Sequence, residues 1–477
     1  MEETILEMNR HEELDYSALA IQQQYTEEIR LMPQRPQTYH VVTYGCQMNA
    51  HDSEKIAGML QDMGLTEAPV RDEADFVIFN TCCVRENAER RALGNVTWLK
   101  EVRKRNPKLM IGVCGCMIQE PGMAEKIVRQ YGFVDLAFGT AALHRFPELF
   151  YRALHEEHVV IEAGGNDVIV ENMPVRRLRH DAAYISIMQG CNNFCSFCIV
   201  PYVRGRERSR TMREIVREAE SLAGQGCKEV MLLGQNVNSY GKDLSEGSFP
   251  DLLRLLDQTG IERIRFMTSH PKDLSDALID VMASSRHVLP QFHLPVQSGD
   301  DEILRKMNRH YTREAYMNKV RKLRAAVPGI GLTTDLIVAF PGETEAQFEH
   351  TLELVEEVGY DSAFTFIYSP RTGTAAARMP DQIPQEVASE RIQRLIALQE
   401  ECQRNVMRRF LGQKESVLVE GLSRRCDTQV SGRGIHGLSV TLPGDSSDVG
   451  QIVEVTVTDI KQNTLLASRM ESEDRAT

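Results

Sequence analysis

Six of the eleven cysteines in this 477-residue chain fall into two groups of three, and each group demands a fold that brings three sulfurs together. The first group is a compact triad that one loop can gather, consisting of Cys191, Cys195 and Cys198. The second is a dispersed triad whose members each lie just beyond an apolar, strand-like run, namely Cys46, Cys82 and Cys116. The carboxyl ends of parallel strands lie along one edge of a sheet, where ligands gather. If these strand-like runs belong to one parallel sheet, the three cysteines of the dispersed triad should therefore meet along one edge of it.

The lack of membrane and secretion segments indicates how these thiols are used. No apolar run is long enough to span a membrane, and the amino terminus lacks the basic and apolar segments of a secretion signal. We therefore expect a cytoplasmic protein without membrane contact, whose reduced thiols act as metal or redox ligands rather than as disulfides. The net charge of −13 argues against nucleic-acid binding by the whole surface but allows a local basic patch.

The length predicts about three domains, and the pattern along the chain indicates where they lie. Residues 1–36 are predicted to form a polar, partly helical and solvated extension. Residues 37–160 alternate strands with helices, which predicts a doubly wound parallel sheet, and residues 161–182 resemble a linker. Residues 183–406 contain six strand–helix units, which predict a partial (β/α)6 barrel with its active site at the strands' carboxyl ends. Residues 407–472 carry short alternating strands, which predict a small antiparallel β-barrel.

Two helices of the predicted partial barrel have recognisable local signals. The helix after the fifth strand should begin with a capping box made by Thr344 and Gln347. A later amphipathic helix is expected to end at Gly412 and to place Gln399 on its polar flank. Its predicted apolar stripe consists of Ile392, Leu395, Ile396 and Leu398.

The C-x3-C-x2-C spacing of the compact triad predicts an iron–sulfur cluster. Such clusters usually take four cysteine ligands, so three thiolates would leave one iron open for another group. Structural zinc also requires four ligands, and the nearest spare thiol, Cys227, precedes a different strand. Buried cysteines that act as small hydrophobic residues are a poor explanation for three thiols in one short loop.

The dispersed triad predicts a second cluster with an open iron. The alternative is that two of its three cysteines are incidental core thiols. Cys83 and Cys114 are close duplicates that could compete as ligands. Cys114 is expected to pack in the core, and Cys83 to point away from Cys82 in an extended chain.

The compact triad and its surroundings resemble the radical S-adenosylmethionine superfamily. The resemblance implies a 4Fe-4S cluster whose open iron binds the amino and carboxylate groups of S-adenosylmethionine, which is then cleaved to a 5′-deoxyadenosyl radical. Phe197, before the last cysteine, would lie against the adenine. Residues 234–236 stand where the superfamily often carries Gly-Gly-Glu, and residues 337–343 resemble its adenine-binding turn. The cofactor-binding residues implied by the resemblance are Phe197, Gln235, Asn236, Gln297, Ile337 and Glu343.

Both triads together resemble the methylthiotransferase family, in particular its branch that modifies N6-dimethylallyladenosine in tRNA. The matching phrases are residues 45–49, 80–82, 84–86, 186–191, 232–238, 268–271, 293–299 and 340–344. The resemblance implies two 4Fe-4S clusters, two uses of S-adenosylmethionine, and transfer of a methylthio group to C2 of the adenosine at position 37, next to the anticodon. A C–H bond at this carbon is unactivated, so a cofactor-derived radical is the plausible agent.

The expected partners are S-adenosylmethionine, the anticodon stem-loop of tRNA, and a small reductase or flavodoxin-type electron donor, with the enzyme itself a monomer. The resemblance implies that the terminal barrel is an RNA-binding TRAM domain. A run of arginines follows the compact triad, beside the predicted active-site loop. The predicted RNA contacts are Arg204, Arg206, Arg210, Arg424, Arg425 and Arg433, although an ordinary solvated surface would also explain the run.

Two alternatives of different kinds remain at this point. One changes the substrate to threonylcarbamoyladenosine tRNA or to an aspartate of a ribosomal protein. Residues 47–48 and 84–86 favour the prenylated adenosine by resemblance alone. The other alternative is a non-catalytic iron–sulfur regulator that binds RNA and needs no open iron.

Overall fold

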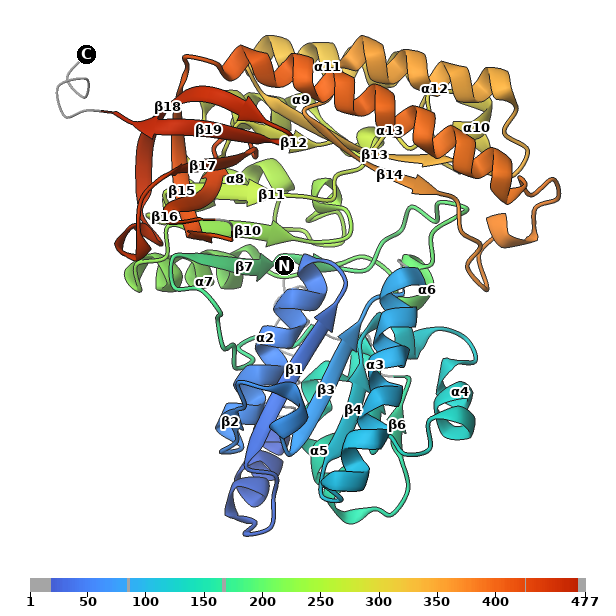
Figure 1. The fold of residues 1–477 in the computed structure, drawn as a ribbon, viewed down its shortest axis with the longest axis vertical. Coiled ribbons are helices and arrows are strands. Elements are labelled where there is room, and N and C mark those ends of the chain that lie inside the picture. The colour runs from blue at the N-terminus through green and yellow to red at the C-terminus, as the bar shows by residue number, and fades with distance from the viewer. Residues whose placement is uncertain (1–18, 84–85, 165–168, 425, 471–477) are drawn as a thin grey trace.

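The computed structural model describes residues 19–83, 86–164, 169–424 and 426–470. It contains an amino-terminal α/β sheet, a central partial barrel and a small closed β-barrel (Figure 1). No helix in these ranges combines the length and apolar character that a membrane span requires.

Residues 19–31 form a helix that packs on the amino-terminal sheet. Ile29 is fully buried in the core of that sheet, and the side chain of Gln22 accepts a hydrogen bond of 3.1 Å from the backbone N–H of Glu148. The predicted helix is therefore present and most of its side chains are exposed, but Gln22 and Ile29 anchor it on the sheet. The first part of the predicted extension lies outside the described residues.

The amino-terminal sheet is parallel throughout and has the strand order β2-β1-β3-β4-β5-β6. Its strands are β1 (Thr38–Tyr44), β2 (Thr66–Glu67), β3 (Phe76–Thr81), β4 (Met110–Cys114), β5 (Leu136–Phe138) and β6 (Val160–Glu162). Helices α2 (Gln47–Asp62) and α5 (Phe146–His155) pack on one face. Helices α3 (Glu86–Arg105) and α4 (Met123–Gln130) pack on the other. The order reverses at β1, so the sheet is doubly wound, as predicted.

The central part contains six parallel strands in two groups, β7-β10-β11 and β12-β13-β14, linked by a bridge between Ile264 and Val288. The strands are β7 (Ala182–Ser186), β10 (Glu229–Leu233), β11 (Arg263–Phe266), β12 (Gln291–His293), β13 (Gly331–Val338) and β14 (Ser362–Ile367). The surrounding helices are α7 (Met212–Gly224), α8 (Phe249–Leu256), α9 (Asp276–Ser284), α10 (Asp301–Lys306), α11 (Arg313–Ala326), α12 (Glu345–Val358) and α13 (Gln385–Met407). This arrangement is the predicted partial (β/α)6 barrel.

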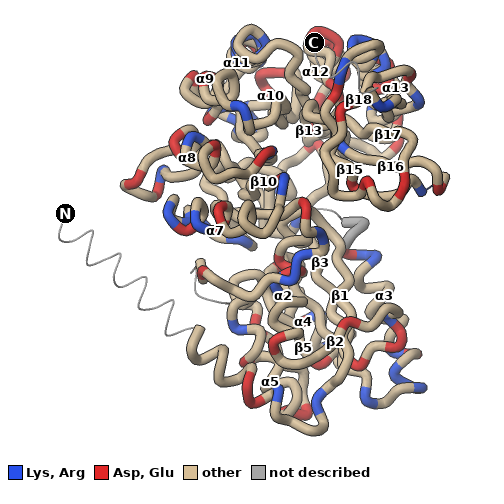
Figure 2. The backbone as a smooth tube through the Cα atoms, turned by 90° about the vertical axis from the view of Figure 1, so that its left-hand side faces the viewer, with Lys and Arg blue, Asp and Glu red and all other residues tan. Residues whose placement is uncertain are grey.

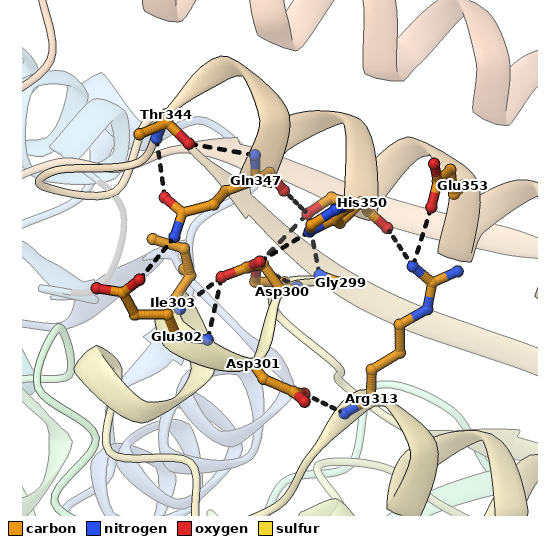
Figure 3. Close-up of polar contacts among 12 residues, drawn as sticks. Gly299, Asp300, Asp301, Glu302, Ile303, Arg313, Thr344, Gln347, His350 and Glu353 are labelled. Carbon is orange, nitrogen blue, oxygen red and sulfur yellow. Dashed lines mark hydrogen bonds and ion pairs between the residues drawn. The ribbon is translucent and has the colours of Figure 1, made fainter.

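Polar caps fix the first turns of α10 and α12, as Figure 3 shows. Thr344 and Gln347 form the predicted capping box at the start of α12. The side chain of Asp300 accepts hydrogen bonds from the backbone N–H groups of Glu302 and Ile303 at 3.0 Å and contacts Nδ1 of His350 at 2.8 Å. These bonds satisfy helix N–H groups that would otherwise lack partners, and they join the turns that follow β12 and β13.

Helix α13 departs from its predicted pattern in two ways. It ends at Met407 rather than at Gly412. Gln399 is only 4% exposed and donates a 3.1 Å hydrogen bond to the carbonyl of Tyr360, whereas Ile396 is 41% exposed. The hydrogen bond to Tyr360 satisfies the side-chain nitrogen of Gln399 on this buried face, whereas its Oε1 is buried without a hydrogen-bond partner.

The terminal barrel is closed by five strands in the order β15-β16-β17-β19-β18. They are β15 (Lys414–Ser423), β16 (Cys426–Gly434), β17 (Ser439–Pro443), β18 (Ile452–Lys461) and β19 (Thr464–Arg469). The predicted antiparallel pairing holds except between β17 and β19, which are parallel. An odd number of strands in a closed ring cannot alternate in direction all the way round, so one pair must be parallel.

Buried arginines attach this barrel to the amino-terminal ends of the central strands. Arg263 and Arg265 of β11 donate 2.9 Å hydrogen bonds to the carbonyls of Arg433 and Gly434 in β16. Glu229, at the start of β10, lies 3.0 Å and 2.8 Å from these two guanidinium groups. The small barrel therefore lies at the end of the central barrel opposite the strands' carboxyl ends.

Candidate active site

The compact triad lies on a loop that is closed at its base by two short antiparallel strands, β8 (Met188–Gln189) and β9 (Arg208–Ser209). Gly190 has a φ of +79°, and an added Cβ there would collide with the carbonyl of Arg206. The backbone N–H of Cys191 donates to Gly205 at 3.1 Å, across the same loop. The closed loop therefore gathers all three thiols, of which those of Cys191 and Cys195 are buried.

A buried arginine contacts one of these thiols. Arg309 donates from its guanidinium to Sγ of Cys195 at 3.3 Å and to the carbonyl of Pro295 at 2.8 Å. The contact places a positive charge beside a thiol that is a candidate metal ligand. Sequence analysis missed Arg309 because a single arginine after a short helix carries no spacing signal.

The other two thiols of the loop favour their protonated form. Burial raises the pKa of Cys191 to about 11 and that of Cys198 to about 12. Thiols in such a setting lose their protons when a positively charged metal centre binds them. Three thiols on one loop, with one buried cation, are the donor set of an iron–sulfur cluster, and we propose that Cys191, Cys195 and Cys198 hold one.

The dispersed triad lies at the carboxyl ends of the adjacent strands β1, β3 and β4. Cys46 caps the start of α2, Cys82 follows β3, and Cys116 begins the short helix η2 (Cys116–Gln119). A hydrogen bond from Cys82 and the charge of Arg204 lower the pKa of Cys46 to about 5. We propose that these three cysteines, brought to one edge by the parallel sheet, hold the second cluster.

The neighbouring thiols Cys83 and Cys114 have different surroundings. Cys114 packs in the core beside Ile78 and Phe138, as expected. Cys83 is fully buried and hydrogen-bonds Cys116, which lowers the pKa of Cys116. Cys83 therefore lies directly beside a proposed ligand of the dispersed triad, a position that its sequence neighbours did not reveal.

Arg204 connects the two triads. It follows α6 (Val200–Val203), the helix directly after the compact triad, which lies against the amino-terminal sheet (Figure 1). It is 7% exposed, donates from Nε to Sγ of Cys116 at 3.1 Å and pairs with Asp52 at 3.0 Å. The prediction that Arg204 contacts RNA is contradicted by this burial, because both ends of its guanidinium are engaged inside the protein.

An apolar cluster lies beside the compact triad. Phe197 packs in it with Ile303, Met307, Ile337 and Phe340. Two predicted cofactor-binding residues, Phe197 and Ile337, thus lie together, and we propose that they form the apolar wall of the cofactor site.

The remaining predicted cofactor-binding residues hold turns at the strand ends. Gln235 accepts a 2.5 Å hydrogen bond from the backbone N–H of Gly190. Gln297 has a φ of +71° and is joined to β13 by two backbone hydrogen bonds. Asn236 donates to Asp273 at 2.8 Å.

Glu343 also holds a turn. Its carboxylate accepts from the backbone N–H of Ala339 at 2.7 Å and from Arg391 at 2.9 Å. Burial raises its pKa to about 7. Ala339 adopts a φ of +58°, and this pair of bonds holds that unusual turn in place.

The predicted RNA-binding arginines differ in exposure. Arg206 is exposed and lies 4.4 Å from the ring centre of Phe194, and Arg424 is also exposed. Arg433 is partly exposed and lies 3.7 Å from Glu420, whereas Arg425 lies outside the described residues. Arg210 pairs with Glu171 and Glu218 in the interior, at 2.6 Å and 2.8 Å, so its predicted RNA contact is wrong.

The wider charge pattern is mixed. In the view of Figure 2, Lys and Arg are interspersed with Asp and Glu along the backbone. A single uniform basic face is not visible from that side, which agrees with the acidic net charge of the chain.

Among the described residues, no three His, Cys, Asp or Glu side chains are close enough to share one metal ion. A cubane cluster has a different requirement, because each of its thiolates binds a different iron and the sulfurs are spread around the cube. None of the eleven cysteines is in a disulfide. All six cysteines of the two triads are therefore available as cluster ligands.

Three family profiles match successive parts of the chain. The Radical SAM superfamily matches residues 185–355, the uncharacterized protein family UPF0004 matches residues 38–139, and the TRAM domain matches residues 408–469. The three matches correspond to the central barrel, the amino-terminal sheet and the terminal barrel.

Curated relatives with high identity cover most of the chain. The tRNA-2-methylthio-N(6)-dimethylallyladenosine synthase of Caldicellulosiruptor saccharolyticus is 53% identical over 86% of this chain and 89% of its own length. The synthase of the same name from Acetivibrio thermocellus is 48% identical over 93% and 94%. Among solved structures, the radical S-adenosylmethionine methyltransferase TsrM from Kitasatospora setae has a TM-score of 0.52 at 15% identity, covering 72% of this chain and 77% of TsrM. This last likeness concerns the fold alone.

Proposed function

Because the chain belongs to the family of tRNA-2-methylthio-N(6)-dimethylallyladenosine synthases, we propose that it adds a methylthio group to C2 of N6-dimethylallyladenosine at position 37 of tRNA, next to the anticodon. The observation that carries the proposal is the junction of the two cysteine triads. Cys198 is the last cysteine of the compact triad. Six residues further along the chain, the guanidinium of Arg204 contacts Cys116 of the dispersed triad. If both clusters act on the same adenine, the two triads must lie close to each other.

The bound groups supply the difficult chemistry. Cys191, Cys195 and Cys198 would hold the cluster that supplies reductive cleavage of S-adenosylmethionine, and Cys46, Cys82 and Cys116 would hold the cluster that supplies the sulfur for transfer.

The chain's own residues position these groups. Arg309 places a positive charge on Cys195, and Arg204 places one on Cys116. The apolar cluster around Phe197 and Ile337 excludes water from the cofactor side. Gln235 and Glu343 hold the two turns on either side of this region.

RNA is the macromolecular partner indicated by the TRAM domain. We propose that the bound element is the anticodon stem-loop, whose unstacked bases are the form of RNA that proteins usually read. Exposed Arg206 and Arg424 are proposed phosphate contacts. The proposal also includes a small reductase or flavodoxin-type electron donor, a monomeric enzyme, and the cytosol as its compartment, where thiols stay reduced for iron binding.

Cysteine variants test the two triads separately. Reduced, reconstituted protein is expected to form 5′-deoxyadenosine and methylthiolated tRNA. Cys191→Ala should form neither product, because the cofactor-cleaving site is lost. Cys82→Ala should still form 5′-deoxyadenosine but should not insert sulfur. Cys402→Ala, a buried cysteine of α13 remote from both triads in the sequence, is the matched control and should retain both activities.

Nucleoside mass spectrometry decides the substrate. Cells without the protein should lose the methylthio adenosine and accumulate its prenylated precursor. Loss of a methylthiolated threonylcarbamoyladenosine instead would assign the alternative substrate. Unchanged 5′-deoxyadenosine formation by Cys191→Ala would falsify the assignment of the radical site.

A further inference from the structure

Several buried polar atoms without a hydrogen-bond partner lie where strands β10 and β11 end. Among the described residues, these atoms are Oδ1 of Asn236, both amide atoms of Asn238, Oγ of Ser269 and Nε2 of His270. Each of the four side chains is at most 8% exposed. An unpaired buried polar group is destabilising, and native proteins contain few of them. A group of them at one place indicates a polar ligand that binds there.

The two loops that carry these atoms are joined to each other. Strands β10 and β11 are adjacent and parallel, so their carboxyl ends lie side by side. Beyond the strands, the backbone N–H of Val237 donates to the carbonyl of Thr268 at 3.1 Å. Asn238 and Ser269 each follow one of these bonded residues. The unpaired atoms therefore belong to one region of the barrel mouth.

One side of this region adjoins the compact triad. The ring of His270 packs edge-on against that of Tyr311, with 5.7 Å between ring centres. The hydroxyl of Tyr311 accepts a 2.9 Å hydrogen bond from Arg309, the arginine that contacts Cys195. His270 is thus separated from a cluster ligand by only two side chains.

The other side adjoins the dispersed triad. Met267, at the end of β11, accepts a 3.4 Å contact from the side-chain amide of Gln47. Gln47 directly follows Cys46 at the start of α2. The unpaired atoms therefore lie between the two proposed clusters, where a base that receives sulfur from one and a radical from the other must lie.

The hydrogen-bonding roles of these groups are defined by their contacts. Nδ1 of His270 accepts from the backbone N–H of Lys272 at 3.2 Å, so the proton of the neutral ring is on Nε2, which is a donor. Burial, followed by the charges of Arg309 and Lys272, holds the pKa of His270 well below its usual range, so the ring is neutral. Asn238 offers one acceptor and one amide donor.

We propose that Asn238, Ser269 and His270 form the subsite that binds the target adenine of the RNA, an inference that rests on the proposed function and specifies how its substrate is selected. An N6-alkylated adenine keeps one N6–H donor and its ring-nitrogen acceptors. An asparagine amide matches N6–H and N7 of adenine. The Nε2–H of His270 and the hydroxyl of Ser269 can then donate to other ring nitrogens, as in enzymes that read a base swung out of its stack.

Steady-state kinetics with a prenylated anticodon stem-loop test the subsite. In reconstituted holoenzyme, His270→Leu should lower kcat/KM for the RNA about 10- to 100-fold, the effect of losing one or two hydrogen bonds to the base. Cofactor cleavage in the absence of RNA should stay at the wild-type rate. His270→Gln, which keeps a donor, should recover part of the loss. His287→Leu, in another loop of the same barrel, is the matched control and should leave both rates unchanged.

Asn238→Leu provides an independent variant should His270→Leu fail to fold, which iron content and circular dichroism would reveal. Loss of RNA-independent cofactor cleavage in folded variants would show that the subsite binds S-adenosylmethionine and would overturn the proposal. Unchanged kcat/KM for the RNA would overturn it as well. A wild-type enzyme that cleaves the cofactor but never methylthiolates the stem-loop would instead refute the proposed function.

Discussion

Replacing Arg204 by glutamine should selectively impair the site of the dispersed triad. The variant removes the 3.1 Å bond to Sγ of Cys116 and leaves Asp52 buried without its cation. A hydrogen bond to a charged group contributes about 1.5–3 kcal/mol. This corresponds to a roughly 10- to 100-fold loss of affinity for the second cluster, the range found when groups that support metal ligands are removed.

The assay is anaerobic iron and sulfide analysis combined with electron paramagnetic resonance of the reduced protein. Arg204→Gln should retain the compact-triad signal and 5′-deoxyadenosine formation but lose most of the second cluster and the methylthio product. Arg217→Gln is the matched control, because that arginine is exposed on α7 and pairs with Glu214 rather than with a thiol. Equal loss of both clusters would show a general folding defect, and full retention of both would refute the role of Arg204.

Three further predictions concern the compact triad and the turn after β13. Gly190→Ala should prevent assembly of the compact-triad cluster, seen as lost iron, because the added Cβ collides with the carbonyl of Arg206. Arg309→Lys should keep a charge near Cys195 but lose the paired hydrogen bonds of the guanidinium to Cys195 and Pro295. The rate of 5′-deoxyadenosine formation should therefore fall roughly ten-fold, while the iron content changes less. Burial raises the pKa of Glu343 from 4.5 to about 7, so its contribution to stability is present at low pH and is lost as the pH rises through this window. The Tm of wild type relative to Glu343→Gln should therefore fall between about pH 4.5 and pH 7, and a pH-independent difference would contradict the assignment.

Local patterns in the sequence were sufficient for most of the fold. The alternation of apolar and polar runs predicts both parallel sheets, and Thr344 and Gln347 predict the start of α12 because a capping box depends only on residues within one turn. The prediction failed for Gln399, whose burial depends on a carbonyl from a distant loop. It also failed for the β17–β19 pair, because strand direction in a closed barrel depends on the number of strands around the whole ring.

The site shows the same division. The spacing of the cysteines, and the position of three of them after successive strand-like runs, are enough to predict both triads. The run of arginines after the compact triad, in contrast, looks uniform in the sequence but separates in space. Arg206 is exposed, Arg210 is neutralised by two glutamates, and Arg204 reaches the other triad.

By itself, the sequence determined which elements form and which thiols are proposed as iron ligands, because periodicity and ligand spacing are local properties of the chain. Only the tertiary structure decided which charges face those thiols. Arg309 lies 114 positions from Cys195 in the sequence, and Arg204 lies 88 positions from Cys116. The unpaired groups of Asn238, Ser269 and His270 likewise become a site only because two parallel strands end side by side.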